Sequence, residues 1–355
     1  MLKMCAKCCI PETHETVEYD HRGVCNICRQ SEQKQLVDWD KKWEELKNLL
    51  DRYRNPNGYD AIIPFSGGKD STFTLYHLVK EHSLKPLVVR FDHGFLRKTV
   101  QENTDRTLKE LGCDFLSFCP NWKVVRHLML ESLRRKGDFC WHCHTGIFSF
   151  PMRMALAFDI QLIVWGEKSS EYTSYYSTDE EEEVDETRFN RFINLGITAE
   201  DMEGMVDVEP RDLDPFRFPP RAELAKLGVR SVCLGSYIKW DTKKQVELIK
   251  QELGWKGDEV EGIPPQYDYE KIECAMQGVR DYIRYLKRGY GRTAHLTSID
   301  IRNDRLSRSE ALDMVRTYDA KRPESLDRFL EYVGLSEDEF MEIVKTHEVA
   351  PWSVS

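Results

Sequence analysis

Apolar and polar residues follow two alternating patterns in the first half of the chain. Short apolar runs that are typical of buried strands lie at 60–65, 85–91, 114–118 and 160–166. Between and around them, apolar residues recur at helical spacing at 70–82, 98–111, 122–135 and 145–158. Strands that alternate with helices predict an α/β fold with a doubly wound parallel sheet.

The segments on either side of this pattern are mainly helical. Residues 31–54 carry Leu36, Trp39, Trp43, Leu46 and Leu50 at helical spacing, which predicts one linking helix. From about residue 196 onward we expect helices at 241–253, at 269–288 and from 309. We therefore predict three parts: a cysteine module at 1–32, an α/β domain at 33–195, and a mainly helical, substrate-binding region at 196–355.

The charge of the chain limits its partners. Lys and Arg number 51 against 61 Asp and Glu, a formal net charge of −10, which makes nucleic acid an unexpected ligand. Seven of these acidic residues lie in "TDEEEEVDET" (178–187), and we expect that run to be a solvated, mobile loop. The chain has no apolar run of membrane-spanning length and no signal pattern, so we expect a soluble, cytoplasmic protein without a membrane partner.

The sequence "IIPFSGGKDS" (62–71) places a glycine turn directly after the first strand. It is not a Walker A loop, because Ile63 stands where the first glycine should be and Asp70 follows the lysine. The S-G-G-K-D-S pattern instead resembles the PP-loop of the ATP pyrophosphatase superfamily. That resemblance implies cleavage of ATP between its α and β phosphates.

Each residue of this turn suits a phosphate ligand. Gly67 and Gly68 would let backbone amides approach the departing pyrophosphate at the start of the next helix. Lys69 adds a positive charge, and Ser66 and Ser71 can donate hydroxyl hydrogen bonds. We therefore predict these five residues as part of the ATP site.

Two further loops agree with the resemblance. It implies that Asp70 holds the Mg²⁺ of ATP, that Asp92 in "VVRFDHGFLR" lies beside the nucleotide, and that Gly166 and Glu167 in "VWGEKSSEY" contact adenylate and metal. All three loops follow strand ends, where ligands of parallel sheets bind. Of this set, we predict Lys69, Asp70 and Glu167 as catalytic.

Cysteines predict one metal site and leave a second one open. Two C-x2-C pairs, which suit one tetrahedral structural Zn²⁺, are formed by Cys5, Cys8, Cys25 and Cys28. A further pair, Cys140 and Cys143, resembles the pair that holds an iron–sulfur cluster in some PP-loop tRNA thiolases. Its third ligand would be Cys274 or Cys233. Alternatives are a substrate-facing pair beside a neighbouring histidine, and thiols that only pack.

The chain as a whole resembles the N-acetyl sugar amidotransferase family. The segments that carry the likeness are the cysteine module, "PFSGGKDS", "FCWHCHTGI", "WGEKSSEY", "LGSYIKWD" (234–241) and "RDYIRYLKRGYGRTAHLTSIDIRN" (280–303). The resemblance implies a role in bacterial polysaccharide or lipopolysaccharide biosynthesis. ATP would adenylate the N-acetyl group of a nucleotide-activated sugar, and ammonia would convert it to an acetamidino group, releasing AMP and pyrophosphate.

Ammonia would come from a separate glutaminase subunit, as the resemblance implies. Residue 2 is leucine, so removal of Met1 uncovers no cysteine nucleophile for glutamine. Residues 280–308 carry eight basic side chains against three acidic ones, which favours contact with an anion, although a solvated helix face is the competing interpretation. The substrate-binding residues predicted here are Arg288, Arg292, His295 and Arg302.

Two other functions compete with this one. A PP-loop tRNA thiolase would share the fold and the adenylation but would use sulfur and the cluster at Cys140 and Cys143. A zinc-knuckle binding protein with an inactive nucleotide site is a third hypothesis. The intact Lys69, Asp70, Asp92 and Glu167 argue against it.

Overall fold

A five-stranded, fully parallel sheet lies at the centre of the α/β part of the chain. The structure is a computed structural model and describes residues 2–171, 173, 182–189, 195–205 and 208–354. The strands are β1 (Ala61–Pro64), β2 (Pro86–Phe91), β3 (Asp114–Phe118), β4 (Leu162–Trp165) and β5 (Arg230–Cys233). Their order is β3-β2-β1-β4-β5, and each pairs in parallel with its neighbours. The predicted fold class is confirmed.

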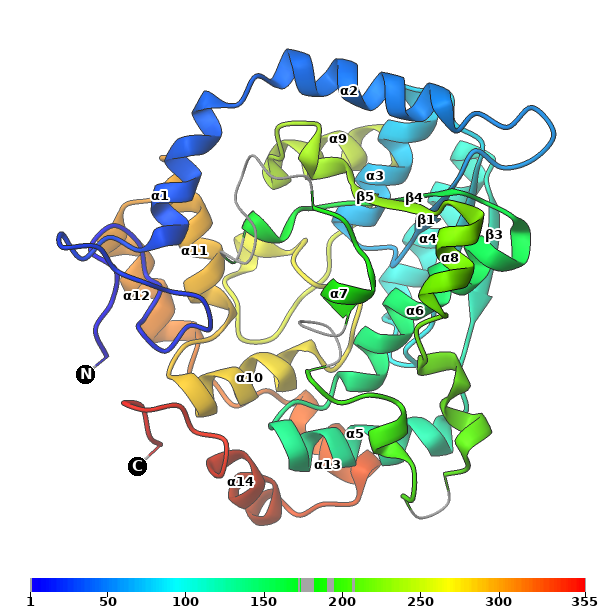
Figure 1. The fold of residues 1–355 in the computed structure, drawn as a ribbon. Coiled ribbons are helices and arrows are strands. Elements are labelled where there is room, and N and C mark those ends of the chain that lie inside the picture. The colour runs from blue at the N-terminus through cyan, green and yellow to red at the C-terminus, as the bar shows by residue number, and fades with distance from the viewer. Residues whose placement is uncertain (1, 172, 174–181, 190–194, 206–207, 355) are drawn as a thin grey trace.

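Helices cover both faces of this sheet (Figure 1). Alternate strand residues point to opposite faces, so Ile63 and Val88 enter one apolar core while Ile62 and Leu87 enter the other. The first core is closed by α3 (Lys69–Lys80), α4 (Lys98–Leu111) and α9 (Thr242–Leu253). The second is closed by α5 (Trp122–Lys136) and α6 (Trp141–Phe158).

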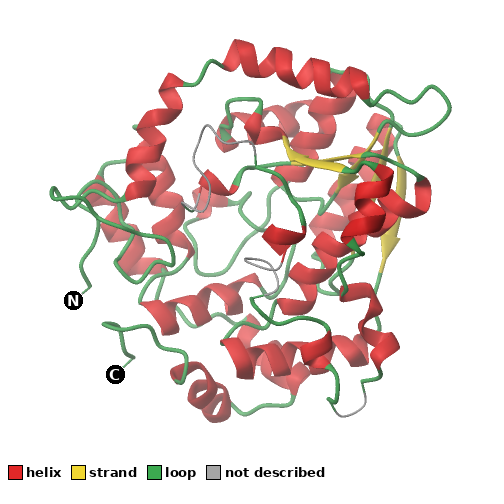
Figure 2. Cartoon of the chain, viewed as in Figure 1, coloured by secondary structure: helices red, strands yellow, loops and turns green. Residues whose placement is uncertain are grey.

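The remaining helices belong mainly to the second half of the chain. They are α7 (Glu186–Arg188), α8 (Arg221–Leu227), α10 (Gln277–Arg288), α11 (Arg292–Arg302), α12 (Arg308–Tyr318), α13 (Ser325–Val333) and α14 (Glu337–Lys345). Helices α10, α13 and α14 share a third apolar core with α5. Figure 2 shows that loops connect the sheet to these helices. None of the helices described combines the length and apolar character needed to cross a bilayer.

Two predicted elements were wrong in detail. The linking helix is divided into α1 (Asn26–Gln33) and α2 (Trp39–Arg52), because Asp38 caps the start of α2, and Leu36 between them is 85% exposed. The helix predicted at 269–288 begins only at Gln277. Residues 269–276 instead form an irregular segment, which we call the strap. Side chains of this segment pair with charged residues near the end of β1.

The acidic run is only partly within the described residues. Positions 178–181 lie outside them. The solvated-loop prediction is wrong for Glu182, which is fully buried, accepts a hydrogen bond from Ser169 N at 2.7 Å and forms an ion pair with Arg188. The adjoining Val184 N donates to Ser231 O in β5 at 2.9 Å, so this part of the run lies along the sheet.

The N-terminal cysteine module packs on the C-terminal helices α11 and α12, far from it in sequence (Figure 1). Cys9 N donates to Ser298 Oγ at 3.0 Å. Arg308 Nε donates to the carbonyl oxygens of Cys5 and Cys8, both at 3.2 Å. The two ends of the chain therefore form one packed region.

Candidate active site

The glycine turn between β1 and α3 is held in a defined shape. Gly67 has φ +82°, and a Cβ there would lie 2.6 Å from Thr104 Oγ1, so glycine is required. Ser71 Oγ accepts hydrogen bonds from Ser66 N at 3.1 Å and Gly67 N at 3.2 Å. Trp255 Nε1 donates to Gly67 O at 3.1 Å. The turn thus brings the start of α3, with its positive helix end, to the edge of the sheet.

Lys69 lies at the centre of a buried chain of opposite charges. Its Nζ is 2.7 Å from Asp70 Oδ2 and 2.9 Å from Glu270 Oε2. Glu270 Oε1 lies 3.5 Å from Arg292 Nη1, and Arg292 Nη2 lies 3.1 Å from Asp281 Oδ1. Burial opposes ionisation of Glu270, but Lys69 and the neighbouring cations hold its pKa at about 2. Lys69, which was predicted to bind phosphate, is therefore connected to the C-terminal helices.

Asp70 has the features of a Mg²⁺ ligand. Its Oδ1 is buried and has no hydrogen-bond partner within the described residues. Burial and the nearby Glu167 carboxylate raise its pKa from 3.8 to about 6. Glu167 itself lies 3.5 Å from Lys271 Nζ. A divalent cation prefers such carboxylate oxygens, so Asp70 and Glu167 fit the predicted metal-binding role.

Two more of the predicted nucleotide residues lie at neighbouring strand ends. Gly166 follows β4, and a Cβ there would lie 3.0 Å from Thr74 Oγ1 on α3, which explains the glycine. Asp92 follows β2 and accepts a hydrogen bond from Gly94 N at 2.8 Å. The order β3-β2-β1-β4-β5 places the site at the β1/β4 switch point, where open parallel sheets bind ligands.

The strap supplies site residues that sequence analysis missed. Ser66 Oγ donates to Glu273 Oε1 at 3.2 Å, and a Cβ on Gly68 would lie only 1.9 Å from that oxygen. The Glu273 carboxylate therefore rests directly on the glycine turn. The alternating charges of "YEKIE" (269–273) could have indicated these residues from the sequence. A buried cation such as Lys69 needs carboxylate partners, and this segment supplies them.

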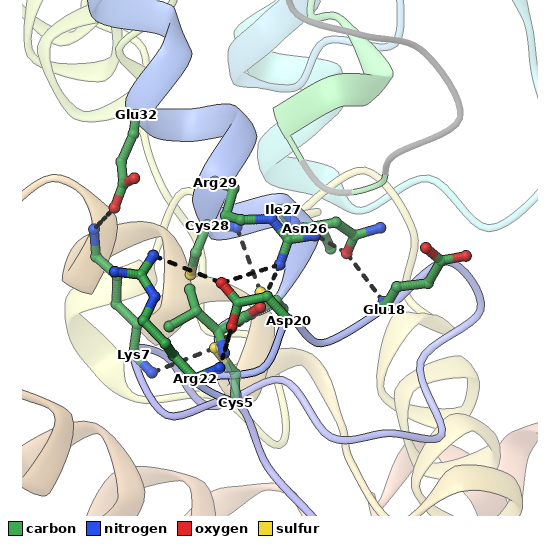
Figure 3. A network of polar contacts seen from close by, with 12 residues as sticks. Cys5, Lys7, Glu18, Asp20, Arg22, Asn26, Ile27, Cys28, Arg29 and Glu32 are labelled. Carbon is green, nitrogen blue, oxygen red and sulfur yellow. Dashed lines mark hydrogen bonds and ion pairs between the residues drawn. The ribbon is translucent and has the colours of Figure 1, made fainter.

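The four N-terminal cysteines that were predicted to bind Zn²⁺ form one compact cluster. One ligand atom from each of Cys5, Cys8, Cys25 and Cys28 lies within 4.8 Å of the others, and all four side chains are buried. Backbone N–H groups of residues 7, 8 and 25 donate to Cys5 Sγ at 3.2–3.4 Å, which favours thiolates. Figure 3 shows that Asp20 lies beside Arg22 and Arg29 where the chain turns back toward the second pair. The geometry fits one tetrahedral ion.

The other cysteines are arranged less regularly. Cys274, in the strap, packs in the same apolar core as Cys140, whereas Cys233 lies in the core beneath the sheet. Burial raises the pKa of Cys274 to about 11 and that of Cys143 further. Within the described residues, no set of three ligands that includes Cys140 or Cys143 is as compact as the N-terminal one. A metal role for Cys140, Cys143 and Cys274 stays a prediction.

A cavity of about 310 Å³ adjoins the strap, and we call it the α10 cavity. Its lining includes three of the four predicted substrate residues, Arg288, Arg292 and His295. Arg302 lies elsewhere and donates to Glu171 O at 3.2 Å. Arg292 reaches both the cavity and the charged chain at Lys69, and Lys271, which also lines the cavity, lies 3.5 Å from Glu167. The two sites are therefore adjacent.

The fold is α/β with a parallel sheet, and its glycine turn resembles that of the PP-loop ATP pyrophosphatase class. Residues 261–351 match the family described as "LPS biosynthesis protein WbpG-like, C-terminal domain", where LPS is lipopolysaccharide. The match covers about a quarter of the chain and includes the strap, α10 and α11. It supports the family predicted from the sequence.

Other similarities are more distant. An uncharacterized protein from Methanocaldococcus jannaschii is 25% identical over 156 residues, 44% of this chain and 55% of that protein. The chain thus spans about half the length of this curated relative. Among solved structures, the NMN synthetase of Francisella tularensis has a TM-score of 0.38 at 12% identity, covering 81% of this chain and 98% of that one. The U34-tRNA thiolase NcsA of Methanococcus maripaludis, with its 4Fe–4S cluster, has a TM-score of 0.38 at 15% identity, covering 95% and 91%.

Proposed function

We propose that the protein is an ATP-dependent, AMP-forming amidotransferase that acts on an N-acetylated, nucleotide-activated bacterial surface sugar. One observation carries this proposal. The strap, which belongs to the part that matches the WbpG-like domain, places Glu270 and Glu273 against the glycine turn and Lys271 beside Glu167. The turn predicted to bind phosphate and a domain similar to one of lipopolysaccharide biosynthesis would therefore form a single site.

The reaction would proceed in two balanced steps. The amide oxygen of the N-acetyl group attacks the α-phosphorus of ATP, and pyrophosphate leaves. Ammonia then adds to the activated carbon and loses protons to solvent, and the original oxygen departs on AMP. The net change replaces the amide oxygen by NH and yields an acetamidino group. Because an amide oxygen is a weak nucleophile, positioning and charge neutralisation must supply most of the rate.

The side chains around the turn suit these steps. Lys69 and the start of α3 would neutralise the departing pyrophosphate. Asp70 and Glu167 would hold the Mg²⁺ that accompanies ATP, and that ion would add charge neutralisation at the phosphates. Gly166 allows the loop after β4 to pack closely against Asp70 and Thr74 of α3. Zn²⁺ at the cysteine module would have a structural role, since four thiolates leave no open position.

A separate glutaminase subunit would deliver the ammonia in the cell. Free ammonium salts should replace that subunit in the test tube, which allows the activity to be measured without the partner. The cytoplasm, where ATP and nucleotide-activated sugars are available, is the proposed location.

The decisive test measures AMP and pyrophosphate release from Mg²⁺·ATP with a panel of N-acetylated sugar nucleotides and ammonium. Mass spectrometry of the sugar then reports the exchange of oxygen for NH. Lys69→Ala should abolish turnover, whereas Lys98→Ala, an exposed lysine on α4, should leave it unchanged. Formation of ADP, or a normal rate for Lys69→Ala, would refute the proposed chemistry.

The tRNA thiolase remains the alternative, and the position of Cys274 is the observation that favours it. Cys274 packs beside Cys140 on a segment that also touches the glycine turn. Iron in anaerobically purified protein, its loss in Cys140→Ser, and sulfur in tRNA would support the thiolase. Zinc alone, together with a modified sugar, would support the amidotransferase.

A further inference from the structure

The α10 cavity has an excess of positive charge over its whole lining. Six basic side chains face it, against the carboxylates of Glu15 and Asp138. The basic residues are Lys271, Arg280, Arg284, Lys287, Arg288 and Arg292. Arg292 also forms ion pairs with Glu270 and Asp281, which do not line the cavity. Counting the lining residues alone, with histidine neutral, the formal charge is +4. A single carboxylate ligand would leave most of this charge unmatched.

Besides Arg280 Nε, two polar atoms of this lining, on Arg284 and His295, lack a hydrogen bond within the described residues. Arg284 Nη1 is buried and, within the described residues, has only an ion pair of 3.7 Å with Asp281 Oδ1, too long for a hydrogen bond. His295 is 8% exposed, and its Nε2 is likewise buried without a hydrogen-bond partner. Buried polar atoms are normally satisfied, so both indicate a ligand that would complete them.

The N-terminal module forms one wall of the cavity. His14 and Glu15 line it, and the Glu15 carboxylate lies 3.2 Å from Arg288 Nε and accepts from Tyr290 OH at 2.9 Å. Burial lowers the pKa of His14 to about 4, so the ring is neutral near pH 7. Neutral imidazoles beside guanidinium groups suit a ligand with both hydroxyl and anionic parts.

We propose that the α10 cavity binds a phosphate-type anion with two or more negative charges, and that the N-terminal module completes this site. Guanidinium groups match phosphate oxygens by paired, charge-assisted hydrogen bonds. A cavity of about 310 Å³ is at the lower end of ligand pockets, large enough for a sugar phosphate group and too small for a folded nucleic acid. Assignment of this anion to the sugar substrate rests on the proposed function.

The test is calorimetric titration of the full-length protein with UDP-N-acetylglucosamine, UDP and glucuronic acid as probes. We expect both diphosphates to bind and glucuronic acid, with one carboxylate, to bind at least about tenfold more weakly. Arg284→Gln should weaken UDP binding by about tenfold or more, and Arg284→Lys by less. The matched control is Arg316→Gln, an exposed arginine on α12, which should bind UDP as the wild type does.

Lys69→Ala separates the cavity from the glycine turn. UDP binding that survives Lys69→Ala and is lost in Arg284→Gln locates the anion in the α10 cavity. Three results would each overturn the proposal. One is UDP binding that is lost in Lys69→Ala and survives in Arg284→Gln. The others are tighter binding of glucuronic acid than of UDP, and equal UDP affinities of Arg284→Gln and Arg316→Gln. Thermal melts identify any variant that fails to fold, and Lys287→Gln then replaces Arg284→Gln. If the wild-type protein makes the acetamidino sugar and Arg284→Gln has the same kinetics, the proposed anion site is refuted while the proposed function stands.

Discussion

Lys69 Nζ lies 2.9 Å from Glu270 Oε2, and both side chains are almost completely buried. The lysine comes from the start of α3 and the glutamate from the strap, so this pair joins the glycine turn to the C-terminal region. A buried ion pair is costly to form but more costly to break on one side. The pair therefore ties the position of the strap to the charge state around Lys69.

Glu270→Gln tests this connection. Loss of the carboxylate leaves Lys69 and Arg292 without a shared partner, and we expect the free energy of unfolding to fall by about 3–5 kcal/mol. Urea denaturation measures this change. Glu247→Gln, at an exposed glutamate on α9, is the control and should stay within about 0.5 kcal/mol of wild type. Similar stability for the two variants would contradict a structural role for the pair.

Asp70→Asn should stabilise the nucleotide-free protein near neutral pH, although it removes a predicted Mg²⁺ ligand. Because the pKa of Asp70 is raised from 3.8 to about 6, its ionisation costs folding free energy as the pH rises through about 6. The nucleotide-free variant should therefore be more stable than wild type at pH 7.5, by roughly 1–3 kcal/mol, and much less so at pH 4.5. Melting curves at both pH values measure this difference.

The raised pKa of Asp70 also predicts that the binding of Mg²⁺·ATP depends on pH. Binding of Mg²⁺·ATP should weaken as the pH falls below about 6, since the protonated carboxyl group no longer ligates the ion. Calorimetric titration with α,β-methylene-ATP and Mg²⁺ measures this. Asp70→Asn should lose both the binding and its pH dependence. A wild-type affinity that is constant from pH 5 to pH 8 would argue against a metal-binding Asp70.

Removal of the metal should affect the α10 cavity as well as the N-terminal module. His14 and Glu15 lie between the two cysteine pairs, so unfolding of the module removes one wall of the cavity. We expect Cys5→Ser to lower the metal content, the melting temperature and the affinity for UDP together. The exposed Cys119 offers a matched control, and Cys119→Ser should retain all three.

Features encoded locally were predictable from the sequence. The apolar runs around Ile62 and Val88 and the glycine turn at Ser66 are set by neighbouring residues, and the structure has them where they were expected. The paired cysteines around Cys5 and Cys25 belong to the same class, because ligand spacing is a local property.

Features that depend on long-range contacts were missed. Strand β5 has only four residues and begins with the polar Arg230 and Ser231, so no apolar run marks it. The strap was predicted as helix, yet Lys271 takes φ +50°, which interrupts a helix, and Glu270 pairs with Lys69 from the first half of the chain. Tertiary charge pairing outweighed local propensity there.

Glu273 gives the last prediction. Its carboxylate accepts from Ser66 Oγ and lies where a side chain on Gly68 would be, so it occupies part of the space that phosphate oxygens need. Like charges repel, and ATP bound as we propose would have to displace Glu273 before its phosphates reach the turn. Glu273→Gln should therefore tighten the binding of α,β-methylene-ATP by about two- to tenfold, the equivalent of one ordinary hydrogen bond. Glu259→Gln, at an exposed glutamate before the strap, should not. Weaker binding in Glu273→Gln would show instead that the carboxylate helps to hold the nucleotide, through Mg²⁺ or the ribose.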